Sequence, residues 1–249
     1  SVHHNLAGGE GLGWGILVSG GSAGASLCRA EVQVIENLVV DNDSHGVMVF
    51  GGDNAQSSRN KVVVSGNTIT GNGGDGLFIA GGIGSFLGGG GAVTRKNTLE
   101  LTIVNNTIAN QLGNGVSLWG GLGSEDGSEG TANDNKVNVT EFSGNQISNS
   151  GGYGILLAGG GPSQANKNVI RGTSSSRVAI AESTSCGNVK GDIQFFGLFP
   201  GDADLPAGTG GQNIVRGFVT ATQADTIAAS DGVAGNTGVV ETSAITACP

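Results

Sequence analysis

The chain has 249 residues, of which 49 are Gly and 22 are Asn, and its formal net charge is −9. Only 4 residues are Pro and no Gly-X-Y period is present, so the composition excludes a collagen-like fibre. A hydrophobic fraction of 37% argues against wholesale disorder, and the abundance of Gly and Asn disfavours a helical protein.

The acidic balance also restricts the partners. Nucleic acid is not expected, because phosphate binding needs a basic stripe. No run of about 18 apolar residues is present, so no membrane span is predicted. Three Cys in a chain of this length do not form a disulfide scaffold. The chain begins at Ser1 and shows no signal peptide, which indicates a processed or excised product.

One motif recurs five times along the chain: Gly, apolar, any, apolar, any, Gly-Gly. Its copies occupy 15–21, 46–52, 76–82, 115–121 and 154–160, at spacings of 31, 30, 39 and 39 residues. A second motif, Asn-x-apolar, keeps step with it and is followed by a further Asn. The Asn pairs are Asn37 and Asn42, Asn67 and Asn72, Asn106 and Asn110, and Asn145 and Asn149.

Period-two alternation predicts that these segments are β-strands, with bends at the Gly and Asn positions. A unit of about 30 residues cannot bury its apolar side alone, so successive units are expected to stack. Equivalent residues then lie about 4.8 Å apart. Stacked Asn side chains are expected to satisfy turn amides, and Gly is expected to supply positive φ at the corners.

The run from Asn145-Gln146-Ile147 to Gly154-Ile155-Leu156-Leu157 resembles the repeat of right-handed parallel β-helix proteins, the pectate-lyase-like architecture. The resemblance covers about residues 5–217. It implies an all-β fold, a single-stranded right-handed parallel β-helix (solenoid) of about six to seven coils with long Gly-rich loops on one side. Lyases, epimerases, hydrolases, phage tail parts and adhesins share this repeat, so it implies no single function.

The expected domains follow the repeat. Residues 1–217 form the β-helix, with regular coils to about 171 and irregular last coils and a cap over 172–217. The Phe-rich stretch 192–200 is expected to plug the open core. Residues 218–249 are expected to be a C-terminal tail packed on the helix. Any disulfide is predicted to join Cys186 to Cys248 and to leave Cys28 unpaired, because about five rungs separate Cys28 from both.

Alternation also predicts an apolar strip that faces away from the core, and this strip is the candidate binding face. A functional cleft, an oligomer interface through the strip, or a cover of loops or of the 218–249 tail are the alternatives, with the tail as the preferred cover. The residues of the strip are Leu17, Met48, Phe50, Phe78, Trp119 and Leu156.

The residue before each repeat Gly forms a column: Trp14, His45, Asp75, Asn114 and Tyr153. A His oriented by a carboxylate is a candidate general base, so His45, Asp75 and Tyr153 are the candidate catalytic residues. The segment 42–47 also resembles the Asn-x-x-His-Gly stretch of alginate C5-epimerases, without that family's Asp-Pro-His signature. The alternative interpretation is that His45 and Asp75 are solvent-facing bend residues.

No metal site is expected, because His3, His4 and His45 do not present three ligands at a fixed spacing. No cofactor is expected either, and Ca²⁺ is the one exception left open. Several basic residues are interpreted as solvated loop ends, with a substrate-binding strip as the alternative. These residues are Arg59, Lys61, Arg95, Lys96, Lys136 and Lys167.

The sequence therefore indicates an extracellular or cell-surface module without catalytic activity. Its stacked coils are expected to present an extended surface to a glycan, an apolar ligand or a partner protein chain. The alternative is a polysaccharide lyase or C5-epimerase that acts on an acidic glycan, with His45 and Asp75 as its acid/base pair.

Overall fold

The computed structural model describes residues 2–3, 13–22, 24–85, 92–124, 129–172, 178–179, 184–201, 207–221 and 237–243. Across these ranges the chain forms strands and no helix, and every strand pair is parallel. The prediction of an all-β fold of stacked parallel strands is confirmed. With no helix in the described ranges, none of them contains a membrane-spanning helix, as expected.

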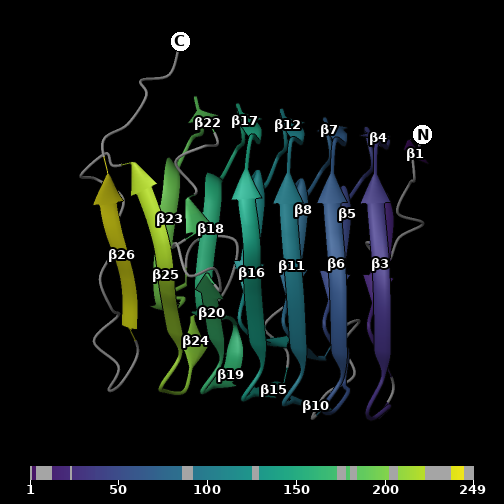
Figure 1. Ribbon diagram of the computed structural model, residues 1–249, viewed down its shortest axis with the longest axis vertical. Helices are drawn as coiled ribbons and strands as arrows, with labels where there is room; N and C mark the ends of the chain where they lie inside the picture. The colour runs from purple at the N-terminus through teal and green to yellow at the C-terminus, as the bar shows by residue number, and fades with distance from the viewer. Residues whose placement is uncertain are drawn as a thin grey trace.

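Two large sheets form opposite sides of the molecule (Figure 1). The long-strand sheet contains β3 (Arg29–Ile35), β6 (Arg59–Ser65), β11 (Thr98–Val104), β16 (Lys136–Ser143), β20 (Val169–Gly172), β21 (Val178–Ala179), β25 (Ile214–Ala221) and β26 (Thr237–Ser243). The motif sheet behind it contains β2 (Ile16–Ser19), β5 (Val47–Phe50), β8 (Leu77–Ala80), β13 (Val116–Trp119), β18 (Tyr153–Gly160) and β23 (Gly191–Leu198).

Smaller sheets lie along the two edges. The short-strand sheet, at the top of Figure 1, contains β1 (Val2–His3), β4 (Leu38–Val40), β7 (Thr68–Thr70), β12 (Thr107–Ala109), β17 (Gln146–Ser148) and β22 (Thr184–Cys186). A four-stranded sheet at the bottom contains β10 (Ala92–Arg95), β15 (Gly130–Asn133), β19 (Ser163–Asn166) and β24 (Gly208–Thr209). A two-stranded pair contains β9 (Ile83–Ser85) and β14 (Leu122–Ser124).

The repeat spacing fixes the register between strands. Val47 pairs with Leu77, Leu77 with Val116, and Val116 with Ile155, so one rung of the stack is one sequence repeat of 30 or 39 residues. The apolar residues that alternate along both large sheets meet in one main core between them. Stacking is thus what buries the apolar side of each repeat.

The predicted ladder of Asn side chains is present. The Asn67 side-chain oxygen accepts the Asn37 N–H at 2.9 Å, the Asn106 oxygen accepts the Asn67 N–H at 3.0 Å, and the Asn145 oxygen accepts the Asn106 N–H at 3.1 Å. Asn67, Asn106 and Asn145 are buried. Each turn amide is therefore satisfied by a side chain from the next rung.

A second ladder differs from the expected one by one residue. Asn42 pairs with Asn72, but Asn72 pairs with Gln111 and not with Asn110, since the Gln111 side-chain oxygen accepts the Asn72 N–H at 3.1 Å. Asn110 and Asn149 instead have φ of 57° and 55° and turn the corner beside the ladder. Asn tolerates this left-handed conformation better than most residues do.

A third ladder runs before the long-strand sheet, where the sequence analysis assigned none. Its members, Asn97, Asn135, Asn168 and Asn213, are all buried, and each accepts a backbone N–H from the preceding rung at 3.0–3.1 Å. This ladder closes the turn that leads into the longest strands.

Gly supplies a positive φ at several corners as predicted, for example at Gly66 and Gly71, but the Gly that opens each motif has a different role. Gly46 does not have a positive φ. A Cβ atom on it would lie 2.6 Å from Ile69 Cγ2 and 2.8 Å from the Gly76 carbonyl oxygen. The position requires Gly because the next rung packs directly against it.

The described strands after residue 190 continue the stack. Residues 191–198, expected to belong to a cap, form β23, which pairs with β18 as the last strand of the motif sheet. Phe195 packs beside Phe218 in the main core, with ring centroids 6.4 Å apart. The boundary expected at 217 falls inside β25, and β26 pairs with β25. The division into two parts stays a prediction.

The cysteines follow the expectation where the structure describes them. Cys28 is a free thiol and Cys186 is disulfide-bonded. Cys248, the predicted partner of Cys186, lies outside the described residues.

The Asn106→Ala variant tests the ladder. It leaves the buried Asn67 N–H without an acceptor and removes the donor to the Val64 carbonyl oxygen. We expect a loss of about 2–3 kcal/mol in the free energy of unfolding, measured by denaturant titration. Gln146→Ala, an exposed change in the adjacent strand, is the control and should cost within about 0.5 kcal/mol. Equal losses would contradict a special role for the ladder.

Candidate functional site

The apolar strip on the outer face of the motif sheet is buried. Met48, Phe50, Phe78, Trp119 and Leu156 are each at most 4% exposed, whereas Leu17 in the first rung is 42% exposed. These five side chains form a second apolar cluster, separate from the main core. The side chains thus face away from the main core as predicted, but they do not present an open face. A binding role for the strip stays a prediction that would require its cover to open.

The cover comes from chain segments that follow the Gly-Gly pairs and from the end of β23. Ile83 of β9, Leu122 of β14 and Phe199 all belong to the second cluster. The Phe199 ring packs edge to face on Trp119, with ring centroids 5.4 Å apart. No described residue of the 218–249 tail is part of the cluster. Most of the tail lies outside the described residues, so its part in the cover stays a prediction.

Asp53 lies at the end of this cover. It forms a parallel bridge with Ile83, which places it in the column of Ile83 and Leu122 at the edge of the cluster. Burial raises the pKa of its carboxyl to about 6. The 39-residue repeats thus have Ile83 and Leu122 at this position, whereas the 30-residue repeat has the Asp53 carboxyl there.

The structure brings two of the three candidate catalytic residues together. His45 Nδ1 accepts the backbone N–H of Asp75 at 2.8 Å, so Nδ1 carries no proton. The His45 ring also stacks on Phe78, with centroids 4.6 Å apart. His45 is thus held by the rung that follows it, through both a hydrogen bond and a ring contact.

Asp75 is buried, which corrects the expectation that this bend faces solvent. Its Oδ1 accepts the Asn114 N–H at 2.6 Å, and Asn114 Oδ1 in turn accepts the Tyr153 N–H at 2.7 Å. Burial raises the pKa of the Asp75 carboxyl, and His45, Ser117 and Asn114 partly oppose this effect. The column is therefore a fourth ladder, in which each side chain completes the turn of the next rung.

Tyr153 lies two rungs beyond Asp75, with Asn114 between them. Two rungs correspond to about 10 Å, and a general acid and base must both lie within hydrogen-bond reach of one substrate. The arrangement therefore pairs His45 with Asp75 and leaves Tyr153 apart. The catalytic assignment of the three residues stays a prediction.

Metal ligands do not gather in the described part of the chain, where no cluster of three or more His, Cys, Asp or Glu side chains could hold an ion. His4 lies outside the described residues, and His3 belongs to β1.

A different set of side chains gathers on the outer surface of the long-strand sheet and the adjoining corner. Three neighbouring hollows there, the first with a volume of about 500 Å³, are lined by eight basic residues that we call the cationic face. They are Arg29, Arg59, Lys61, Arg95, Lys96, Lys136, Lys167 and Arg171. Six of the eight were predicted to be loop-end residues, and the stacking places Arg29 and Arg171 with them.

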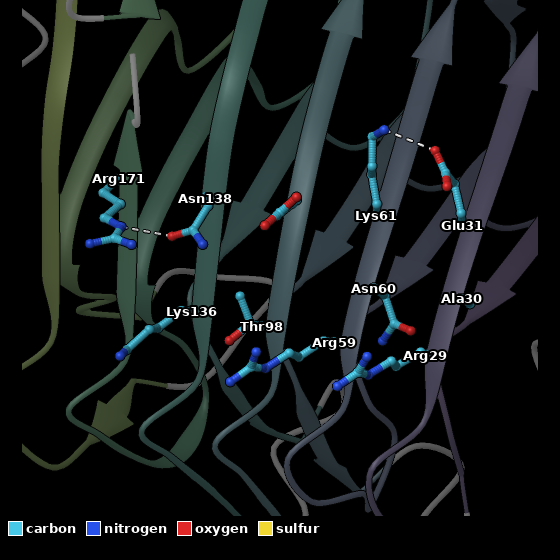
Figure 2. Close-up of a pocket in the computed structure, with 11 residues that line it drawn as sticks. Arg29, Ala30, Glu31, Arg59, Asn60, Lys61, Thr98, Lys136, Asn138 and Arg171 are labelled. Atoms are coloured by element: carbon cyan, nitrogen blue, oxygen red, sulfur yellow. Dashed lines mark hydrogen bonds and ion pairs between the residues drawn. The ribbon is translucent and has the colours of Figure 1, made fainter. Parts of the chain in front are cut away.

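Strand register arranges the cationic face in rows that run across the strands (Figure 2). In the first row Arg29 pairs with Arg59, Arg59 with Thr98, and Thr98 with Lys136. The second row contains Glu31, Lys61, Glu100, Asn138 and Arg171. Within it Lys61 forms an ion pair with Glu31 at 2.8 Å, and Arg171 Nε donates to Asn138 Oδ1 at 2.7 Å.

The Asp75→Ala and Asp75→Asn variants separate the structural role of this carboxyl from a catalytic one. Ala leaves the Asn114 N–H without an acceptor, so we expect a loss of about 1–3 kcal/mol in unfolding free energy. Asn keeps an oxygen acceptor and removes a buried charge, so it should keep or raise the melting temperature. If both variants are as stable as the parent, the ladder role of Asp75 is contradicted.

The Asp53→Asn variant tests the cover. Because the folded-state pKa lies above the ordinary value of 3.8, protonation favours the folded state. Stability should fall as the pH rises through about 6 and stay low above it. At about pH 7.5 the variant should be more stable by about 1 kcal/mol, a figure discounted for partial exposure. Near pH 4 the gain should vanish, and thermal melts of the variant and the parent at both pH values measure the difference.

Comparison with known proteins adds no assignment: the chain matches no family model, no curated protein and no solved structure. The function of the chain is therefore inferred from the geometry of the cationic face.

Proposed function

We propose that the chain is a right-handed parallel β-helix of about six to seven coils that acts as a binding module without catalytic activity. The outer face of the long-strand sheet is its binding surface, and a glycan is its ligand. We place the module outside the cell or at the cell surface. The proposal takes the coil handedness from the repeat motif and the surface from the cationic face.

The proposal is carried by one observation: the outer face of five strands of the long-strand sheet is hollowed and lined by side chains that can form hydrogen bonds. β3, β6, β11, β16 and β20 pair in register, so their outward side chains repeat along the stack. Charged and amide side chains line the hollow, which suits a ligand rich in hydroxyl groups. The apolar strip offers no comparable surface, because its own chain covers it.

The enzyme alternative has less support. Asp75 is buried and its Oδ1 accepts a turn amide, and His45 Nδ1 accepts another. Both groups therefore have structural partners that explain their presence at the bend. The cationic face, by contrast, contains charged side chains that the packing does not explain.

A panel of immobilised polysaccharides, neutral and acidic, tests the proposal. We expect at least one polysaccharide to be retained without chemical change. Incubation should give no unsaturated uronate product by ultraviolet absorbance and no C5 inversion by NMR. His45→Ala, far from the cationic face, should bind as the parent does while it remains folded. Turnover that depends on His45 and Asp75 would instead support the lyase or epimerase, and retention of no polysaccharide would reject the binding function.

A further inference from the structure

We infer that the ligand of the cationic face is an acidic glycan, which lies along the stack across the strands and is held by Arg29, Arg59 and Lys136. This inference rests on the proposed binding function and adds the ligand class and the residues that recognise it.

Positive charge is concentrated on the cationic face of an otherwise acidic chain. The described residues that line the three hollows comprise eight basic and three acidic side chains, a net charge of +5. The whole chain carries −9, so subtracting +5 leaves −14 on everything else. A cationic face on so acidic a chain selects an anionic ligand locally and repels it elsewhere.

The cations of the first row are not neutralised by neighbouring carboxylates. Arg29, Arg59 and Lys136 are exposed, and none of them forms an ion pair with another described residue. Arg29 and Arg59 stand directly opposite each other on adjacent strands, an arrangement of like charges that destabilises a sheet. Figure 2 shows both guanidinium groups at the same end of the sheet as Lys136, with Thr98 between Arg59 and Lys136. A bound anion would remove this repulsion.

The side chains of the two rows suit different groups of one ligand. Guanidinium groups match carboxylates and sulfates through paired hydrogen bonds. In the second row, Glu100 offers carboxylate oxygens to hydroxyl groups, and the oxygens of Glu31 and Asn138 accept bonds from Lys61 and Arg171. A ligand that carries both anions and hydroxyls along its length therefore fits both rows, and acidic glycans have this composition.

The same features disfavour a nucleic acid. The hollows are lined by no aromatic side chain on which a base could stack, among the residues described. The three cations lie on a row of four successive strands whose ends are about 14 Å apart, which matches a ligand with spaced charges.

The experiment is isothermal titration of the full chain with polygalacturonate, heparin, dextran and oligothymidylate, at low and physiological salt. The variant is Arg59→Gln, and Lys190→Gln is the control of equal charge change, exposed and outside the cationic face. We expect polygalacturonate or heparin to bind more tightly than dextran and more weakly as salt rises. Arg59→Gln should weaken binding about tenfold, and Lys190→Gln should leave it unchanged.

The remaining outcomes each decide a point. Preference for polygalacturonate over heparin, or the reverse, identifies the anion as carboxylate or sulfate. Dextran binding that Arg59→Gln leaves unchanged overturns the inference and keeps the proposed function. Binding of no polysaccharide overturns both. Oligothymidylate that binds as tightly, with the same tenfold loss, overturns the choice of a glycan. Thermal melts of Arg59→Gln should match or exceed those of the parent, because a like-charge contact has been removed.

Discussion

Buried turn amides need hydrogen-bond acceptors, and in this protein the neighbouring rung supplies them. Strand N–H groups pair along the sheets, but the N–H groups at the corners would be left over, at a cost of about 1–3 kcal/mol each. Three ladders of amide side chains and the His45 column provide acceptors for corner groups. The ladders also lock the register, because a slip of one residue would break several of them at once.

Much of the fold could be predicted from the sequence because the determinants are local and repeated. Alternation identified the strands, and the 30- and 39-residue spacing identified the pairs that the structure shows. The one-residue difference at Gln111 arose because a ladder requires a side-chain oxygen at one position, which Gln supplies as well as Asn does. The ladder through Asn97 has the same Asn-x-apolar motif, as in Asn97-Thr98-Leu99, but it was missed because the preceding rung has Ser58 in place of Asn.

The candidate site was less predictable, for a physical reason. The outward direction of Phe50 and Trp119 follows from alternation, but their cover depends on which distant segment folds over them. Ile83 and Leu122 follow the Gly-Gly pairs of their repeats, 39 residues apart, but alternation does not show that the segment after each pair folds back over the strip. Likewise, the six basic residues noted in the sequence became a face only when stacking placed Arg29 beside Arg59. Sequence spacing predicted the columns, but not how neighbouring columns combine into a surface.

The row from Arg29 to Lys136 has a spacing that side-chain evolution cannot alter. The distance between its members is set by the backbone hydrogen bonds between strands, about 4.8 Å for each rung. Point substitutions can therefore change which positions of the row are charged, but not the interval between them. Duplication or loss of a whole repeat would lengthen or shorten the row by one interval. The length of polymer that such a protein contacts therefore changes in steps of one repeat.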